Sequence, residues 1–107
     1  MDMNEMLQQV QQLQAQMEKA QEELAHETVE ASAGGGMVTV KATGALEITE
    51  IKIAPEAIDP EDPELLADMI LAAVNEAVRS AHSLMESKLG GLAGGALGGL
   101  GLPGLGE

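Results

Sequence analysis

A regular spacing of apolar residues near the start of the chain most limits the fold. Between residues 3 and 25, apolar side chains recur at alternating intervals of four and three, with Gln, Glu and Lys between them and no Gly or Pro. This period of 3.5 residues is typical of a helix that packs along its length against another helix. Such a helix extends about 35 Å, more than a small sheet needs, so part of it should project. The stripe consists of Met6, Val10, Leu13, Met17, Ala20 and Leu24.

The helix that covers this stripe is either the chain's own second helix or a helix of another copy, and the spacing leaves both open. The chain has 107 residues and no Phe, Tyr, Trp or Cys, so its core must be built from aliphatic residues and seven Met. A thin aliphatic core in a short chain favours self-association as a way to bury enough apolar surface. We therefore expect a homodimer.

Alternation with a period of two follows the first helix and predicts three strands, over residues 27–33, 37–43 and 46–54. Tight turns at Gly34-Gly35-Gly36 and Gly44-Ala45 separate them. Because both connections are too short for a crossover, the strands should form an antiparallel meander.

The third predicted strand changes phase in its middle. Leu46 and Ile48 share one parity, whereas Ile51 and Ile53 share the other. One extra residue at Thr49-Glu50 would return both pairs to the same face of the sheet, so we expect a β-bulge or sharp twist there.

A second helix is predicted over residues 63–89. Asp62 is a suitable N-cap, Pro63 suits the first helical position, and Gly90 is a natural stop. The tail, residues 90–107, is rich in Gly and Leu and is expected to be disordered, because ordering so much Gly costs conformational entropy. The apolar stripe of the second helix consists of Leu66, Met69, Ile70, Ala73, Ala77, Ala81, Leu84 and Met85.

These elements predict an α+β fold: a helix, a three-stranded antiparallel meander and a second helix, forming one domain over residues 1–89. We expect seven apolar residues of the first helix and the third strand to lie either in the core or in the homodimer interface. They are Met6, Val10, Leu13, Met17, Leu24, Ile51 and Ile53.

The charge of the chain restricts nucleic-acid binding. Its formal net charge is −13, from 18 acidic and 5 basic residues. Proteins that bind DNA usually present a basic patch, so an acidic chain needs its few cations to converge on one surface. For each cation the alternative is a solubilising surface charge or ion pair; Glu76, for example, lies at helical pairing distance from Arg79. The candidates for phosphate contact are Lys19, Lys41, Lys52, Arg79 and Lys88, with Lys41 and Lys52 expected on the outward face of neighbouring strands.

The sequence offers no candidate set for catalysis, a cofactor or a metal. His26 and His82 are isolated in sequence, and the acidic segment 55–62 lacks the ligand spacing and glycine of a calcium-binding loop. Gly34-Gly35-Gly36 precedes a strand rather than a helix N-terminus, which argues against a phosphate loop. We expect no enzyme activity, small-molecule substrate or membrane role, and, since no signal peptide is recognisable, a cytoplasmic location.

The order of elements and several segments resemble the YbaB/EbfC family of nucleoid-associated proteins. The resemblance covers about residues 3–89. It is carried by the Gln- and Met-rich segment Met6–Leu24, by Gly34–Val40, by Thr43-Gly44-Ala45, by Ile51–Pro55 and by Leu65–Ala77.

This resemblance implies an intertwined homodimer, with long helices projecting from a joined central sheet, that binds duplex DNA without sequence preference on the bacterial nucleoid. The chain departs from the family at the third strand, where members often carry basic residues. Here Glu47, Thr49 and Glu50 take the exposed positions and leave only Lys52, which predicts weak DNA binding. The alternative is an acidic protein–protein adaptor with little or no DNA affinity.

Overall fold

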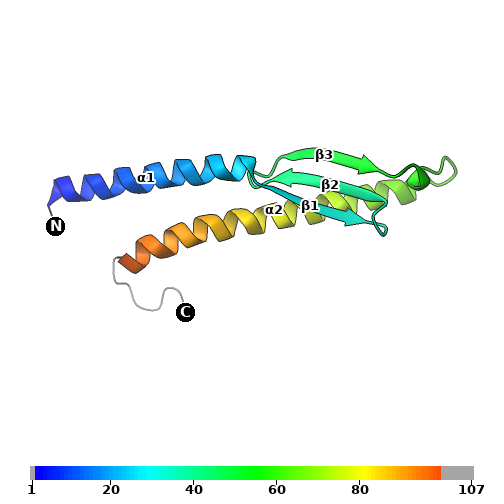
Figure 1. Cartoon of the computed structure of the whole chain (residues 1–107). Coiled ribbons are helices and arrows are strands. Elements are labelled where there is room, and N and C mark those ends of the chain that lie inside the picture. The colour runs from blue at the N-terminus through cyan, green and yellow to red at the C-terminus, as the bar shows by residue number, and fades with distance from the viewer. Residues whose placement is uncertain (1, 100–107) are drawn as a thin grey trace.

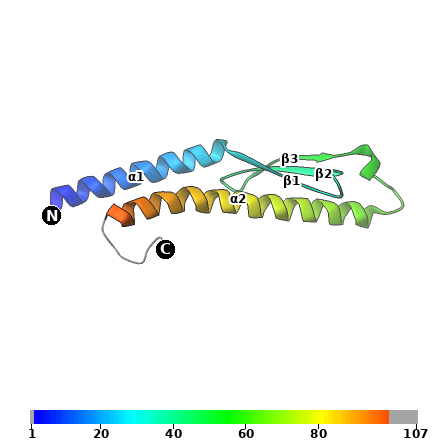
Figure 2. The same ribbon diagram turned by 60° about the horizontal axis from the view of Figure 1, so that its bottom comes forward.

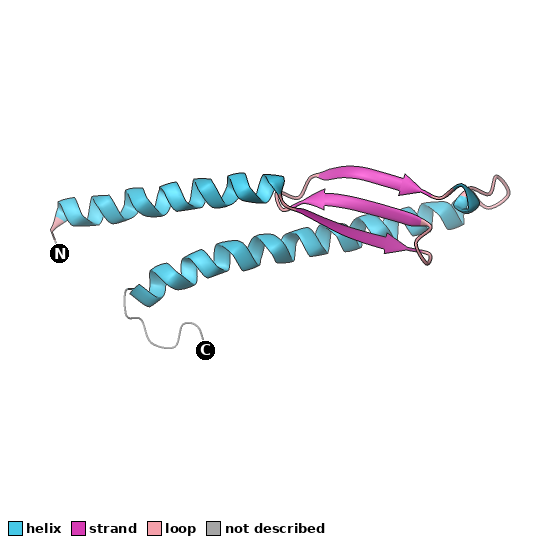
Figure 3. Cartoon of the chain, in the orientation of Figure 1, coloured by secondary structure: helices cyan, strands magenta, loops and turns pink. Residues whose placement is uncertain are grey.

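The computed structural model describes residues 2–99 of the chain, with side chains as far as residue 92. It confirms the expected α+β fold of a helix, a three-stranded antiparallel meander and a second helix (Figures 1 and 3). The elements are α1 (Met3–His26), β1 (Thr28–Ala33), β2 (Val38–Thr43), β3 (Ile48–Ile53), a 3-10 turn η1 (Pro55–Ala57) and α2 (Pro63–Gly99).

The molecule is elongated, with extents of 70 × 27 × 16 Å. The first part of α2 lies across one face of the sheet, and α1 runs beyond the sheet, beside the later part of α2 (Figures 1 and 2). One end of the molecule is therefore a sheet covered by a helix, and the other end is a pair of helices.

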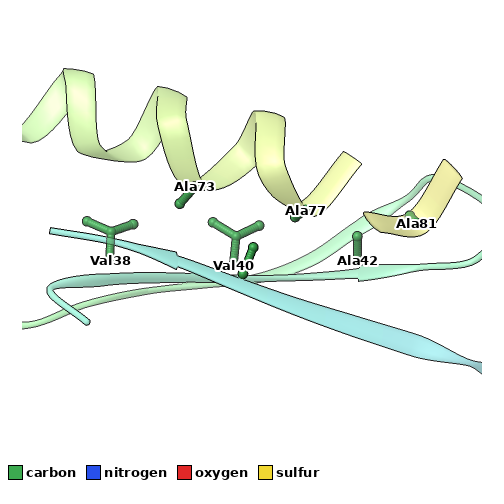
Figure 4. Packing of buried hydrophobic residues seen from close by; sticks show 7 residues of the cluster. Val38, Val40, Ala42, Ala73, Ala77 and Ala81 are labelled. Carbon is green, nitrogen blue, oxygen red and sulfur yellow. The ribbon is translucent and has the colours of Figure 1, made fainter. Parts of the chain in front are cut away.

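Small residues bring α2 close to the sheet. Three alanines at intervals of four face three inward residues of β2, and all six side chains are completely buried (Figure 4). Because an Ala side chain is only a methyl group, the helix can lie directly on the strands. The inward faces predicted for β2 and for the second helix are confirmed at these positions. The residues are Val38, Val40, Ala42, Ala73, Ala77 and Ala81.

The predicted bulge is present in β3. Lys41 pairs with Glu50 and Ala42 pairs with Ile48, so Thr49 is the extra residue between them. The Thr49 hydroxyl donates a hydrogen bond of 3.4 Å to the carbonyl of Lys41. The bulge returns the isoleucines on both sides of it to the face that bears α2, because cross-strand partners share a face.

Both turns of the meander depend on special backbone conformations. Gly34, Gly35 and Gly36 have φ angles of 64°, 68° and 93°, which favour glycine. Leu46 has φ 66° and lies in the second turn, so β3 begins at Ile48 rather than at residue 46 as predicted. A residue in this left-handed conformation cannot continue a strand.

The predicted end of the second helix is wrong. Asp62 caps the start of α2 as expected, through a 3.3 Å bond from the Leu65 amide, but the helix continues past Gly90 to Gly99. A glycine ends a helix by adopting a positive φ, which Gly90 does not do. The structure thus places residues 90–99 in a helix where the sequence predicts a disordered tail, and Leu92 in this extension lines a groove together with residues of α1. Residues 100–107 lie outside the described part of the chain.

The stripe on α1 divides into two parts. Ala20 and Leu24 are 8% and 2% exposed, in the part of α1 that packs beside α2. Toward the N-terminus, Met6, Val10 and Leu13 are 53%, 51% and 39% exposed. The chain's own second helix therefore accounts for the end of the stripe nearest the sheet, and the described part of the chain leaves the other end uncovered.

Candidate nucleic-acid interface

Two of the five candidate cations lie together on the outward face of the sheet. Lys41 on β2 and Lys52 on β3 alternate with inward residues of their strands, and Lys52 lies opposite Thr39 on β2. Both lysines therefore point away from α2, as predicted. Lys52 is 67% exposed at its side chain and Lys41 is 40% exposed.

A single carboxylate lies between these two lysines. Glu50 pairs across the strands with Lys41, and its oxygens lie 3.4 Å from the Nζ of Lys41 and 3.8 Å from the Nζ of Lys52. A second acid, Glu30 on β1, lies opposite Lys41 in the register. The outward face therefore carries two lysines and two glutamates, and its net charge is zero.

Arg79 lies on α2 and is held by Glu76 one helical turn earlier. Both the Nε and the Nη2 of Arg79 donate to the same Glu76 oxygen, at 3.2 and 2.8 Å. This is the pair that the spacing of three residues suggests, and Arg79 stays 67% exposed at its side chain. Exposed pairs of this kind contribute only about 0–1 kcal/mol, so a phosphate can compete for the guanidinium.

Lys88 is the most constrained of the cations. Its Nζ donates to Glu23, at 3.0 Å, and to Glu27, at 2.5 Å, and its side chain is only 21% exposed. The hydrogen bonds to Glu27 and Glu23 raise the pKa of Lys88, and the bond from Lys88 lowers the pKa of Glu23. Lys88 therefore fastens α2 to the end of α1, and it is poorly placed to contact DNA.

Lys19 lines a groove between the two helices. The groove has a volume of about 290 Å³ and also involves Lys88 and Glu23. Lys19 is near enough to Glu23 to help lower the pKa of that carboxyl group. It is the one cation for which the described part of the chain provides no ion pair within 4 Å.

The cations thus do not form one patch within a single chain. Lys41 and Lys52 lie on one side of the sheet, whereas Arg79 and Lys88 belong to α2 on the other side (Figure 2). The sequence identified the cations, but the pairing of Glu50 with the two sheet lysines and the pairing of Lys88 with two glutamates were not predicted. The bulge predicted at Thr49-Glu50 is the signal that could have placed Glu50 opposite Lys41. The contacts of Lys88 span more than sixty residues, and no local pattern indicates them.

The two histidines lie on different helices. His82 pairs with Glu86 at 3.0 Å on the surface of α2, and His26 lies at the end of α1. Within the described residues, no three His, Asp or Glu side chains are grouped closely enough to hold a metal ion. No helix in that part of the chain has an apolar stretch that could span a membrane.

Comparison with known proteins gives a match over most of the chain. The sequence model of a family described as the YbaB/EbfC DNA-binding family matches residues 1–96. A nucleoid-associated protein of Acetivibrio thermocellus is 53% identical over 104 residues, covering 97% of this chain and 89% of that protein. One of Streptomyces avermitilis is 50% identical over 104 residues, covering 97% of this chain and 91% of that protein.

The fold also occurs in a solved structure. The crystal structure of an uncharacterized protein from Helicobacter pylori superimposes with a TM-score of 0.78 and covers 87% of this chain and 98% of that chain. The sequence identity is 18%, so this likeness concerns the fold alone.

Proposed function

The chain belongs to the YbaB/EbfC DNA-binding family, and from this we propose that it is a nucleoid-associated protein that binds duplex DNA as a homodimer, without sequence preference. The observation that carries the proposal is the family match over residues 1–96, together with relatives of about 50% identity that are named nucleoid-associated proteins. Their names also support a location on the nucleoid in the cytoplasm.

The arrangement of cations supports contact with phosphates rather than with bases. Lysine and arginine on exposed surfaces bind the DNA backbone, which positions a protein but carries no sequence information. Four of the five cations are already paired with carboxylates, and the chain carries a net charge of −13. Binding should therefore be weak, because few phosphate contacts form and the overall field repels DNA, and it should fall as salt concentration rises, because the contacts that do form release counterions.

Fluorescence anisotropy with labelled duplexes of unrelated sequence tests this function. We expect similar affinities for all duplexes at about 50 mM salt, and a marked loss of affinity at about 200 mM. Strong preference for one duplex would contradict binding without sequence preference. Failure to bind any duplex at protein concentrations approaching about 1 mM would contradict DNA binding itself.

The uncovered inner face of β3 supports the homodimer. Ile51 and Ile53 lie on the face that bears α2, but α2 packs on β1 and β2, and the two isoleucines remain 45% and 37% exposed. Within the described chain β3 pairs only with β2, so its other edge offers free backbone groups to a second strand. A second copy that pairs along β3 would extend the sheet and bury these isoleucines.

The mass in solution and one pair of variants test the dimer. Ile51→Lys would bury a charge in the β3 interface, so we expect light scattering to show a single-chain mass where the wild type shows twice that mass. Leu71→Lys changes another exposed apolar residue, on α2 and 61% exposed, and should leave the dimer intact. A wild-type mass of one chain, or equal effects of both variants, would contradict pairing along β3.

The adaptor function remains the second candidate, and the projecting part of α1 favours it. Met6, Val10 and Leu13 form an exposed apolar stripe on a helix that carries acidic side chains and no Lys or Arg before Lys19. Such a stripe can lie in an apolar groove of a partner protein. A stoichiometric protein partner that stays bound after nuclease treatment, combined with no DNA binding by the purified chain, would favour this function.

A further inference from the structure

The outward face of the sheet is a polar surface that the described helices leave open. α2 covers the opposite face, and no described helix lies on the outward side (Figure 2). Across the strands, Ser32 pairs with Thr39, which pairs with Lys52, so two hydroxyl groups and an amine follow one another in a row. Hydroxyl and amine groups of this kind commonly donate to phosphate oxygens.

The neighbouring row contains the acids. Glu30, Lys41 and Glu50 follow one another across the three strands, and Glu50 reaches both lysines. Glu50 occupies the position between the two amines where a bridging phosphate would place its oxygens. It is 40% exposed, and pairs this accessible to water are weak and open readily.

Two of the other cations are held less favourably for DNA, and Lys19, which has no ion pair within 4 Å among the described residues, lines the groove between the two helices. Lys88 is shared between two carboxylates and is mostly buried, and Arg79 has one carboxylate to itself. On the outward face of the sheet, one carboxylate serves two lysines. This is the place in the molecule where the loss of one acid frees the most positive charge.

We propose that the outward face of the sheet is the surface that meets DNA phosphates, and that Glu50 limits the affinity by holding Lys41 and Lys52. The inference rests on the proposed DNA-binding function and adds the surface and the residue that regulates it. A phosphate that approaches this face must replace the Glu50 carboxylate or lie beside it, and both cases involve repulsion between like charges. Removing that one charge should therefore strengthen binding more than removing any distant acid.

Three glutamate-to-glutamine variants of the full chain test this inference. Glu50→Gln frees the two sheet lysines, and Glu76→Gln frees Arg79 on α2. Glu5→Gln changes the net charge by the same amount in the first turn of α1, where Glu5 is exposed. This end of α1 is remote from the sheet (Figure 1). Affinity for one labelled duplex is measured by fluorescence anisotropy over a series of salt concentrations. Circular dichroism verifies that each variant keeps the fold.

We expect Glu50→Gln to bind the duplex about three- to tenfold more tightly than the wild type, with a steeper dependence on salt because more phosphate contacts form. Glu5→Gln should change affinity much less, since charges farther away than a Debye length of about 8–10 Å are screened. Adding Lys41→Gln and Lys52→Gln to the Glu50→Gln variant should abolish the gain.

Five results would overturn the inference, and the last of them would also contradict the proposed function. Equal gains for Glu50→Gln and Glu5→Gln would mean that only net charge matters, and a larger gain for Glu76→Gln would move the DNA-facing surface to α2. A gain that survives the two lysine changes would exclude the sheet lysines as its source. Binding by the wild type with no gain for Glu50→Gln would overturn this inference and leave the proposed function intact, whereas no binding by either protein would contradict both.

Discussion

The two ends of this molecule use similar apolar stripes in different ways. At the sheet end, Ala77 on α2 and Val40 on β2 are completely buried in the core between α2 and the sheet. At the helical end, Met6 and Val10 belong to an equally regular stripe on α1, yet each is about half exposed. An apolar stripe thus shows which face of a helix can be buried, but the elements within reach decide whether that face is covered.

The same substitution made in both regions tests this difference in packing most clearly, and it has the largest expected effect on stability. Ala77→Leu inserts extra carbon atoms between α2 and the sheet, where no space exists, and should lower the free energy of unfolding by about 3 kcal/mol. Ala15→Leu adds the same group to an exposed position of α1 and should change it by less than about 0.5 kcal/mol. Urea unfolding monitored by circular dichroism measures both. Similar losses for the two variants would mean that α1 is packed as tightly as α2.

A glycine at the junction of the two regions gives the next largest effect. A Cβ added to Gly44 would lie 2.6 Å from the Leu24 Cδ2 and 2.9 Å from the Leu24 backbone oxygen. Since the backbone oxygen cannot move away freely, Gly44→Ala should lower the free energy of unfolding by about 2 kcal/mol. The same unfolding experiment measures it.

Gly90→Ala is the matched control for Gly44→Ala and has the opposite expected sign. A Cβ at Gly90 meets no atom within 4 Å and the residue lies inside α2, so the variant should be up to about 1 kcal/mol more stable. A loss of stability would instead indicate that Gly90 ends the helix, as the sequence suggests, and would contradict the extension of α2 to Gly99.

The smallest expected effect concerns the attachment of α1 to α2. Lys88→Met removes the bonds to Glu23 and Glu27 but keeps an apolar stem, so hydrogen exchange of the last turns of α1 should quicken while the unfolding midpoint changes little. Lys19→Met is the control and should leave this exchange nearly unchanged. Faster exchange across the whole sheet in Lys88→Met would show that the attachment is not local.

The pH dependence of this attachment follows from its two shifted groups. The pKa of Glu23 is lowered from 4.5, so its contribution is present above pH 4.5 and is lost as the pH falls through the lowered pKa. The pKa of Lys88 is raised from 10.5, so its contribution is present below pH 10.5 and is lost as the pH rises through the raised pKa. The difference in exchange between wild type and Lys88→Met should therefore be constant near neutral pH and shrink below pH 4.5.

Local patterns predicted the elements that depend on neighbours in sequence. The strand alternation, the cap at Asp62 and the bulge at Thr49 depend on neighbours a few residues away, so the sequence contains enough information to place them. The end of α2 was predicted wrongly because Gly90 can either stop a helix or continue it, and its local sequence does not decide which. For the candidate interface, the sequence identified the cations but not the partners of Lys88, which come from the other end of the chain.

The sequence by itself determined the order of helix, meander and helix, because periods of 3.5 and two residues fix which side chains share a face. It also determined that cations would be few. Only the tertiary structure decided that Ala77 would be buried and Met6 exposed, and that Lys88 would be enclosed while Lys52 stays open to solvent. Burial and ion pairing depend on which distant elements come within a few ångströms, and that proximity is a property of the packed chain.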